Sequence, residues 1–307
     1  MQYDLIIIGG SAAGVAAAIY AKRRNLNFLL LSTDIGGEVA TSGEIENYLG
    51  FPKTDGIELA GKFKEQLKYN QIGYQEVRVE KVEKGEGFFT IRGKQNGSAV
   101  ELQTKTLLIA TGVHPRELNI RGEKEFRNKG VSYCTVCDGP VYQNRVSATI
   151  GGGNSGMESV LMLAEIASKC YLLQRGDTLK GDEVLAQKVM SHPKITVIFN
   201  TNTKEIFGDT FVKGLRYEDT KTGEMHELAV GGIFAHIGML PNSSFIDIVE
   251  KNEFGEIKVD TLCRTSVPGV FAAGDVTDIP YKQITIAAGQ GTCAALAAVD
   301  YLNKLKN

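Results

Sequence analysis

The sequence predicts an α/β protein built from two Rossmann-like, three-layer ββα domains, with the second inserted into the first. Three observations predict this architecture. A strand, a glycine turn and a helix open the chain, and the same pattern recurs from residue 147. A strand at residues 269–275 and an alanine-rich helix at 285–302 lead back to the first domain. The length of 307 residues suits two domains of ordinary size.

Composition and charge narrow the classes of function. The formal net charge is -2, acids and bases are mixed along the chain, and 43% of the residues are apolar. These values give no basic face for nucleic acid and no polybasic membrane anchor. No apolar run approaches the roughly 20 residues of a membrane helix, and the N-terminus has no cationic leader. Five cysteines, an odd number, fit a reducing compartment with one functional pair, so we expect a cytoplasmic protein with a small soluble partner or substrate.

The chain opens with an apolar strand at residues 3–8, then a glycine turn, a helix at 15–24 and a second strand at 27–32. A continuous apolar strand indicates burial on both faces, as in a parallel sheet. Glycines at such a turn let the backbone approach a pyrophosphate, which rests on the amides at the helix N-terminus. Two glycines match the G-x-G-x-x-G spacing and the middle position is serine. The candidate contacts are Gly9, Ser11, Ala12, Ala13 and Gly14.

Two later segments extend this candidate site. An irregular loop rich in hydrogen-bonding groups contributes Gly37, Glu38 and Asn47. A helix is expected at residues 56–69, and a small antiparallel meander at 76–92 with 99–102. A separate buried strand at 106–112 then ends in a glycine turn, a second place where backbone can touch a ligand. Its candidate contacts are Ala110, Thr111 and Gly112.

Residues 131–140 hold the feature with the clearest chemistry. Cys134 and Cys137 are close enough in sequence to close a small disulfide ring, and Asp138 follows directly. A C-x-x-C motif indicates either half of a metal site or a redox-active dithiol. Zinc takes about four ligands, and the sequence offers no second pair at ligand spacing. We therefore expect a redox dithiol and no metal. The other cysteines are expected to be small buried hydrophobic residues: Cys170, Cys263 and Cys293.

The second strand–turn–helix unit directly follows the dithiol. A strand at residues 147–150 leads into a glycine turn, a helix at 157–167 and a strand at 170–174. All three glycines of the dinucleotide fingerprint are present here in the structural context that it needs. The candidate contacts are Gly151, Gly153, Asn154, Ser155 and Gly156. Two dinucleotide units with a dithiol between them suggest two nucleotides that pass electrons to a disulfide.

The end of the strand at 170–174 bears on which nicotinamide cofactor fits. An acid about 20 residues past the glycines would hold the ribose 2′-hydroxyl of NADH, whereas arginine would suit the 2′-phosphate of NADPH. Gln174 stands at that place, followed by Arg175 and Lys180. The missing carboxylate and the available cations favour NADPH. The alternative is that both cations are solvated surface charges.

The rest of the chain completes the second domain and returns to the first. We expect a helix at residues 182–190, a hairpin at 211–230, and a strand at 232–237 in which His236 is a packed core residue. The strand at 269–275 ends in Gly274 and Asp275. A carboxylate there can accept hydrogen bonds from a polyol chain, and the helix that follows can aim its positive N-terminus at a flavin ring.

In their order along the chain, these motifs resemble the low-molecular-weight thioredoxin reductases over essentially the full length. The matching segments are 110–112, 134–139, 151–156, and 274–275 with Gln283 and Ile284. The resemblance implies an FAD-binding domain at residues 1–115 and 245–307, and an NAD(P)H-binding domain at 116–244 that carries the C-x-x-C. It also implies a homodimer and a large domain rotation during turnover.

The resemblance further implies roles for three residues. Cys137 would lie against the flavin as the charge-transfer thiol, and Cys134 would attack the disulfide of the partner protein. Asp138 would protonate the leaving thiol, with a structural turn residue as the alternative. A thiolate is the nucleophile in disulfide exchange, and C-x-x-C pairs commonly have lowered pKa values.

Part of the second domain departs from the reductases that use NADPH, which carry a His-Arg-Arg-x-x-x-Arg pattern. The aligned segment at residues 174–180 keeps one arginine and one lysine. Residues 217–219, 222–224 and 232–234 are more similar to the NADH-using flavoprotein of alkyl hydroperoxide reductase. That flavoprotein carries an extra N-terminal disulfide domain, which we expect here to be a separate protein. NADH thus stays open beside NADPH.

The leading hypothesis is a thioredoxin-disulfide reductase that passes electrons from NAD(P)H through FAD to Cys134 and Cys137, and on to thioredoxin or a glutaredoxin-like protein. One alternative is an NADH-dependent reductase that feeds a peroxiredoxin system through a separate disulfide carrier. Another is a flavin dithiol oxidase, which would have no use for the intact turn at 151–156. A non-catalytic redox sensor would leave the placement of the C-x-x-C and its acid unexplained.

Overall fold

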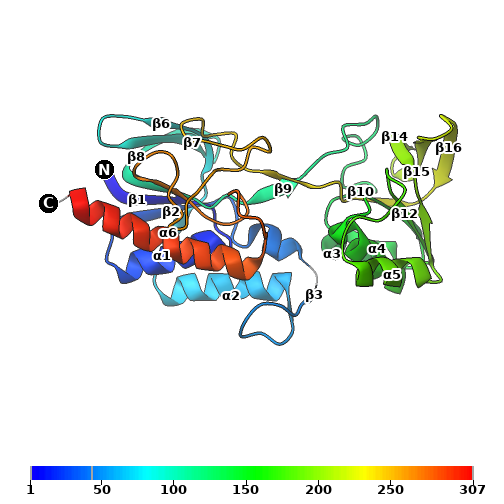
Figure 1. The fold of residues 1–307 in the computed structure, drawn as a ribbon, viewed down its shortest axis with the longest axis horizontal. Helices are drawn as coiled ribbons and strands as arrows, with labels where there is room; N and C mark the ends of the chain where they lie inside the picture. The colour runs from blue at the N-terminus through cyan, green and yellow to red at the C-terminus, as the bar shows by residue number, and fades with distance from the viewer. Residues whose placement is uncertain (1, 43, 306–307) are drawn as a thin grey trace. The chain divides into compact units, whose positions relative to one another are not determined.

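The computed structural model describes residues 2–42 and 44–305, and the chain divides into two compact units. Unit one comprises residues 1–114 and 240–307, and unit two comprises residues 115–239 (Figure 1). The chain passes between them along β9 (Val113–Pro115) and β18 (Met239–Pro241), which pair as a two-stranded sheet. Unit two is therefore an insertion in the sequence of unit one.

The sheet of unit one has a parallel centre. β1 (Gln2–Ile8) pairs with β2 (Phe28–Leu31) and β8 (Ser98–Ile109), and β19 (Val270–Ala272) pairs with β8. Successive residues of β1 enter opposite cores. Leu5 and Ile7 pack with the helices, whereas Ile6 and Ile8 pack on the other face. Burial of both faces explains the unbroken apolar sequence of β1.

Two helices that are distant in sequence pack together on one face of this sheet. α1 (Ala12–Arg23) and α6 (Ile284–Leu305) lie side by side (Figure 1), and their small residues form much of the core. A Cβ added at Gly291 of α6 would lie 2.0 Å from the carbonyl oxygen of Ala13. Glycine thus permits backbone contact between α1 and α6 at this level. The third helix of the unit, α2 (Gly56–Tyr69), begins and ends where the sequence predicts.

One expectation about the strands of unit one is wrong. The segments at 99–102 and 106–112 are not separate strands, because β8 runs unbroken through most of both. Its first half pairs antiparallel with β7 (Phe89–Gln95), and its second half pairs parallel with β1. The burial pattern changes accordingly from alternating to continuous. The other short elements are η1 (Gly37–Thr41), β3 (Glu44–Ile45), β4 (Thr54–Asp55), β5 (Tyr74–Gln75) and β6 (Arg78–Lys84).

Unit two combines a parallel and an antiparallel sheet. The parallel sheet has the order β10 (Val131–Ser132), β17 (Gly232–Ala235), β11 (Val146–Ile150), β12 (Lys169–Leu173) and β13 (Ile195–Ile198). The antiparallel sheet has the order β14 (Thr201–Gly208), β15 (Val212–Asp219) and β16 (Met225–Ala229). The predicted hairpin corresponds to β15 and β16, whereas β13 and β14 are not predicted from the sequence. The helices are α3 (Thr135–Asp138), α4 (Asn154–Ile166) and α5 (Glu183–Ser191), with the 3-10 turn η2 (Gly139–Tyr142).

The part of the chain that the structure describes contains neither a candidate membrane-spanning helix nor a candidate metal site. None of its helices is long and apolar enough to cross a membrane. Residues 2–42 and 44–305 also contain no group of three or more histidine, cysteine or acidic side chains that could hold a metal ion.

Candidate active site

The first glycine turn leaves no room for side chains at two positions. Gly9 has a φ of +118°, and a Cβ there would lie 2.1 Å from the carbonyl oxygen of Ala110. A Cβ at Gly14 would lie 1.8 Å from the carbonyl oxygen of Gly9. The backbone of the turn therefore contacts the end of β8. The turn leads directly into α1, which begins three residues earlier than predicted. A helix N-terminus with bare backbone before it is a cradle for a pyrophosphate.

Ser11 occupies the middle position of this turn without blocking it. It is the N-cap residue of α1, and its hydroxyl donates a 2.6 Å hydrogen bond to the carbonyl of Gly36. The next loop is therefore tied to the turn, and a Cβ at Gly37 would lie 3.4 Å from the Ser11 Cβ. Ala12 and Ala13 are buried in α1. The structure thus brings Gly37 next to Ser11 of the glycine turn.

Two carboxyl groups of unit one are sheltered around this turn. Burial raises the pKa of Glu38, although a hydrogen bond from Thr41 and the charge of His114 act in the opposite direction. Burial also raises the pKa of Asp275, with Lys282 opposing the shift. The charge of Asp275 contributes to the raised pKa of Glu38, so the two groups are close enough to interact. Both are partly exposed and can accept hydrogen bonds from hydroxyl groups of a ligand.

Gly274, which precedes Asp275 at the end of the predicted strand at 269–275, lies near the start of α1, just after the first glycine turn. This glycine has a φ of +77°, and a Cβ there would lie 3.2 Å from the Ala13 Cβ. Its amide donates a 2.8 Å hydrogen bond to the side-chain oxygen of Gln290, in α6. Gln290 is not predicted from the sequence, because an amide within an alanine-rich helix carries no local signal of a backbone partner.

The end of β8 is held by a reciprocal pair of hydrogen bonds. The Thr111 hydroxyl donates to the Asn242 carbonyl at 2.6 Å, and the Asn242 side-chain amide donates to the Thr111 carbonyl at 2.8 Å. Gly112 accepts a further 2.9 Å bond from the Asn242 amide, and its own φ is +61°. These bonds join the first and last segments of unit one beside Ala110. Asn242 is not among the residues predicted from the sequence.

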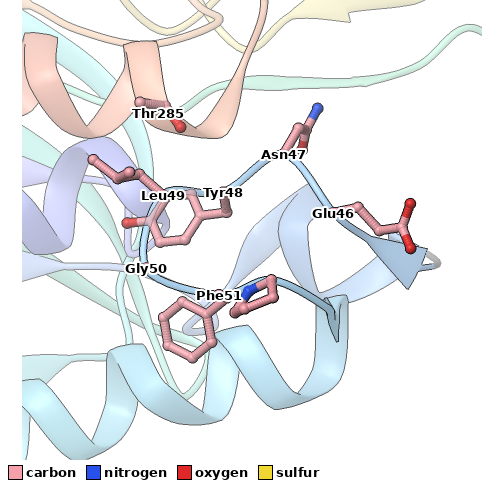
Figure 2. Close-up of a pocket in the computed structure, with 8 residues that line it drawn as sticks. Glu46, Asn47, Tyr48, Leu49, Gly50, Phe51 and Thr285 are labelled. Carbon is pink, nitrogen blue, oxygen red and sulfur yellow. The ribbon is translucent and has the colours of Figure 1, made fainter.

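Asn47 and Gln283 meet although they are distant in sequence. The Asn47 amide donates a 3.3 Å hydrogen bond to the Gln283 side-chain oxygen. Beside this contact lies an open pocket of about 500 Å³ lined by residues 46–52 and Thr285. Figure 2 shows the loop that carries Glu46 to Phe51, with Thr285 of α6 above it in this view. Ile284, the first residue of α6, packs instead against the hydrophobic core, so its side chain has a structural role.

The second glycine turn repeats the geometry of the first. Gly151 has a φ of +115°, and a Cβ there would lie 2.0 Å from the carbonyl oxygen of His236. A Cβ at Gly156 would lie 1.8 Å from the carbonyl oxygen of Gly151. Gly153 is the N-cap residue of α4, and no side chain caps the amides of its first turn. Those amides remain for a phosphate, and the exposed Ser155 stands beside them.

Gln174 has a structural role that is not predicted from the sequence. Its buried side chain accepts a 3.1 Å hydrogen bond from the Gly152 amide and donates a 2.7 Å bond to the Thr178 carbonyl. The carboxamide thus joins the glycine turn to the segment at 174–182. Two further hydrogen bonds join the same segments. The Lys180 amide donates to the Gly152 carbonyl, and the Asp182 amide donates to the Asn154 side-chain oxygen. Gln174 therefore shapes the site, and both its nitrogen and its oxygen already have protein partners.

Arg175 and Lys180 project from this fixed segment. Both side chains are exposed. Neither has an ion-pair partner in the part of the chain that the structure describes. Cations in this arrangement are available to an anionic group of a ligand bound at the turn of residues 151–156.

Cys134 lies immediately before the single helical turn of α3 and forms a disulfide. Its amide donates a 3.0 Å hydrogen bond to the buried Ser132 hydroxyl, and its carbonyl accepts a 3.1 Å bond from the Asp138 amide. Cys134 and Asp138 are both partly exposed. The side chain of Cys137 lies outside the described residues, so its pairing with Cys134 stays a prediction.

The other three cysteines, Cys170, Cys263 and Cys293, are free thiols. Cys170 and Cys263 are buried, as the sequence predicts. The expectation is wrong for Cys293, which is partly exposed. It lies on α6 between buried residues, at the border of the face that packs against the core.

The sequence profile of the family described as pyridine nucleotide-disulphide oxidoreductase matches residues 3–291. The chain belongs to this family. The description of the family joins a pyridine nucleotide with a disulphide. The glycine turns, their open helix N-termini and the disulfide at Cys134 fit such groups.

Individual relatives differ in their stated roles. The chain is 40% identical over 307 residues to a component of the alkyl hydroperoxide reductase of Escherichia coli, covering 99% of this chain and 59% of that protein. It is 42% identical over 302 residues to an NADH dehydrogenase of Bacillus subtilis, covering 98% of this chain and 58% of the relative. The chain thus spans about three-fifths of these curated relatives. The crystal structure of thioredoxin reductase from Lactococcus lactis superposes with a TM-score of 0.91 at 36% identity, covering 98% of this chain and 99% of that one.

In this pyridine nucleotide-disulphide oxidoreductase, the residue after Cys134 belongs to a hydrogen-bond network with two buried hydroxyl groups, those of Thr135 and Ser159. The Thr135 hydroxyl lies 2.6 Å from the Ser159 hydroxyl of α4 and 3.1 Å from the His236 Nε2. Burial lowers the pKa of His236 to about 4, so the imidazole is neutral at neutral pH. The sequence predicts a core position for His236, whereas the structure leaves its side chain partly exposed, and these partners are not predicted. They come from three separate segments of unit two, and no local motif connects them.

Proposed function

We propose that this protein is a thioredoxin-disulfide reductase that takes electrons from NAD(P)H and delivers them through the Cys134–Cys137 disulfide to thioredoxin or a glutaredoxin-like protein. The observation that carries the proposal is the partly exposed disulfide at Cys134, located in the same unit as the complete glycine turn. Bound FAD would supply the relay of two electrons between the nicotinamide and the disulfide. The proposal includes a cytoplasmic homodimer, which the resemblance to low-molecular-weight thioredoxin reductases implies.

The residues of unit one would bind FAD. The turn from Gly9 to Gly14 and the N-terminus of α1 would hold the pyrophosphate. Glu38 and Asp275, both sheltered near that turn, would accept hydrogen bonds from hydroxyl groups. The segment of residues 110–112 and the pair Asn47–Gln283 would complete the wall around the cofactor.

The residues of unit two would bind the nicotinamide dinucleotide. Its pyrophosphate would rest on the amides that begin α4, and Arg175 and Lys180 would bind a ribose 2′-phosphate. Gln174 carries a carboxamide in place of the carboxylate that would hold a 2′-hydroxyl, and that carboxamide is engaged with Gly152 and Thr178. These features favour NADPH over NADH.

Cys134 and Asp138 would perform the exchange with the partner protein. Two electrons and two protons convert the disulfide into a dithiol. The Cys134 thiolate then attacks one sulfur of the partner's disulfide, and the other sulfur leaves as a thiolate that Asp138 protonates. Attack by Cys137 on the mixed disulfide restores the disulfide of this protein and releases the reduced partner.

A second candidate is an NADH-dependent reductase of a peroxiredoxin system that works through a separate disulfide carrier. It is favoured by the similarity to the alkyl hydroperoxide reductase component over 99% of this chain. The two candidates share the chemistry at Cys134 and differ in the nucleotide and in the partner. A dithiol oxidase remains less favoured, because it would not need the geometry of residues 151–156.

The test is an anaerobic assay of the FAD-loaded protein with oxidised thioredoxin, using NADPH or NADH at equal concentration. We expect NADPH to be oxidised faster. The Arg175→Gln/Lys180→Gln variant should raise the KM for NADPH about tenfold with little change for NADH, because about 1.4 kcal/mol of charge-assisted binding is lost. Lys188→Gln, on the exposed face of α5, is the matched control. Failure of both nucleotides to reduce thioredoxin, with turnover restored by a peroxiredoxin and its disulfide carrier, would favour the second candidate.

A further inference from the structure

Two free cysteines of unit one, Cys263 and Cys293, lie close together. The Cys263 thiol donates a 3.5 Å hydrogen bond to the carbonyl of Gln290, one helical turn before Cys293 in α6. The Cys293 thiol in turn donates a 3.7 Å bond to the carbonyl of Thr261, two residues before Cys263. Each thiol therefore reaches the backbone of the segment that carries the other thiol, so the two side chains are neighbours.

Both sulfurs are carried by well-fixed backbone. Cys263 has a φ of +59°, an unusual value for a residue with a side chain. Asp260 holds this conformation, because its Oδ1 accepts bonds of 2.9 Å from the amides of both Leu262 and Arg264. Cys293 lies on α6, between Gly291 and Ala294, which are both buried. The left-handed turn thus places the Cys263 thiol against the backbone of α6, within hydrogen-bond distance of the Gln290 carbonyl.

The two thiols differ in access and acidity. Cys293 is partly exposed, whereas Cys263 is only 2% exposed. Burial and the neighbouring Cys293 raise the pKa of the Cys263 thiol to about 12. A reagent in solution therefore meets Cys293 first, and Cys263 reacts through Cys293.

We propose that Cys263 and Cys293 form a second thiol pair, separate from Cys134 and Cys137, that closes to a disulfide when a low-molecular-weight disulfide oxidises Cys293. The Cys293 thiolate attacks the reagent disulfide RSSR, forming a mixed disulfide and releasing one RS⁻. The Cys263 thiolate then attacks the Cys293 sulfur and releases the second RS⁻. The two protein thiols lose two electrons and two protons, and the reagent becomes two RSH. The second step is slow, since little Cys263 is ionised at neutral pH.

This pair also contacts the segment that holds Gly274. The carbonyl of Gln290 accepts the Cys263 S–H bond, while the side chain of the same residue accepts a bond from the Gly274 amide. Closure of the disulfide removes the S–H donor and links residues 260–264 covalently to α6. The link restricts the unfolded chain, so the oxidised protein should have a higher thermal midpoint than the reduced protein.

The experiment treats the full-length, FAD-loaded protein with oxidised glutathione, blocks remaining thiols by alkylation, and maps unreduced peptides by mass spectrometry. We expect glutathione on Cys293 at early times and a peptide pair linked through Cys263 and Cys293 later. Cys170, a free thiol with 0% exposure, is the internal control and should only be alkylated after unfolding.

Single variants test the two steps, modification of Cys293 and closure by Cys263, one at a time. In Cys263→Ser, glutathione should stay on Cys293, and in Cys293→Ser, Cys263 should remain unmodified. Persistent glutathione on Cys293 of the wild-type protein with no linked peptide would overturn the proposal. Two free thiols after prolonged treatment would overturn it as well. Neither outcome depends on which nucleotide or partner the enzyme uses.

Discussion

Thr135 connects the redox segment to the interior of unit two through its hydroxyl, which bonds both Ser159 and His236. Replacement by valine keeps the shape of the side chain but leaves the buried Ser159 hydroxyl and the partly exposed His236 imidazole without this partner. We expect Thr135→Val to lower the free energy of unfolding by about 1–3 kcal/mol, measured by urea denaturation. Thr135→Ser retains the hydroxyl and should stay close to wild type. Equal stability of the valine variant would show that the network contributes nothing.

His236 should make stability depend on pH in a defined window. Above pH 6.5 the imidazole is neutral in both the folded and unfolded states and contributes no pH dependence. As the pH falls from 6.5 toward 4, the unfolded state takes up a proton that the folded state does not, so stability falls. The loss is on the order of 3 kcal/mol over this window.

The measurement is the difference between wild type and His236→Gln in urea midpoints at several pH values. Carboxyl groups titrate in both proteins and cancel in the difference. Parallel curves for the two proteins between pH 6.5 and 4 would contradict the lowered pKa of His236.

Single residues also show how far sequence reasoning extends. The glycines of both turns and the C-x-x-C are identifiable, because their chemistry depends on local spacing. The roles of Gln174 and Gln290 are not, because each side chain bonds to a backbone amide brought near it only by the folded chain. The contact of Cys263 with Cys293 likewise depends on a left-handed turn that no nearby glycine signals.

The packing of α1 against α6 depends on one small residue. A Cβ at Gly291 would meet the Ala13 carbonyl oxygen at 2.0 Å, whereas a Cβ at Gly289 in the same helix would meet nothing within 4 Å. We expect Gly291→Ala to destabilise the protein by roughly 1–3 kcal/mol or more. Gly289→Ala should stabilise it by roughly 0.5–1 kcal/mol, since alanine favours a helix. Thermal unfolding of both variants tests the pair, and equal midpoints would contradict the predicted helix contact.

Elements with strong apolar patterns are predictable from the sequence, and those with weak patterns are not. β1 and α2 follow from a continuous apolar run and from helical periodicity. β14 has only two buried residues, Thr201 and Ile206, and is stabilised as a strand by its pairing with β15. The sequence of β8 suggests two strands because its halves face different environments, although its backbone pairing is continuous. The tertiary pairing that decides both cases is invisible in a local window.

At the scale of the whole molecule, the two glycine turns form a matched pair in separate units. A Cβ at Gly14 or at Gly156 would lie 1.8 Å from the carbonyl oxygen of the first glycine in its own turn. We expect Gly14→Ala to lose bound FAD, seen as loss of flavin absorbance. Gly156→Ala should keep FAD, which dithionite still reduces, but should slow flavin reduction by NAD(P)H at least tenfold, about 1.4 kcal/mol. Loss of FAD from both variants would contradict separate nucleotide sites.

The central claim is that electrons leave this molecule through the disulfide at Cys134. The most direct test compares wild type with Cys134→Ser in two anaerobic assays: stopped-flow reduction of the flavin by NAD(P)H, and steady-state reduction of oxidised thioredoxin. We predict that the variant keeps flavin reduction at a rate close to wild type and loses thioredoxin reduction. Undiminished thioredoxin reduction by Cys134→Ser would contradict the claim.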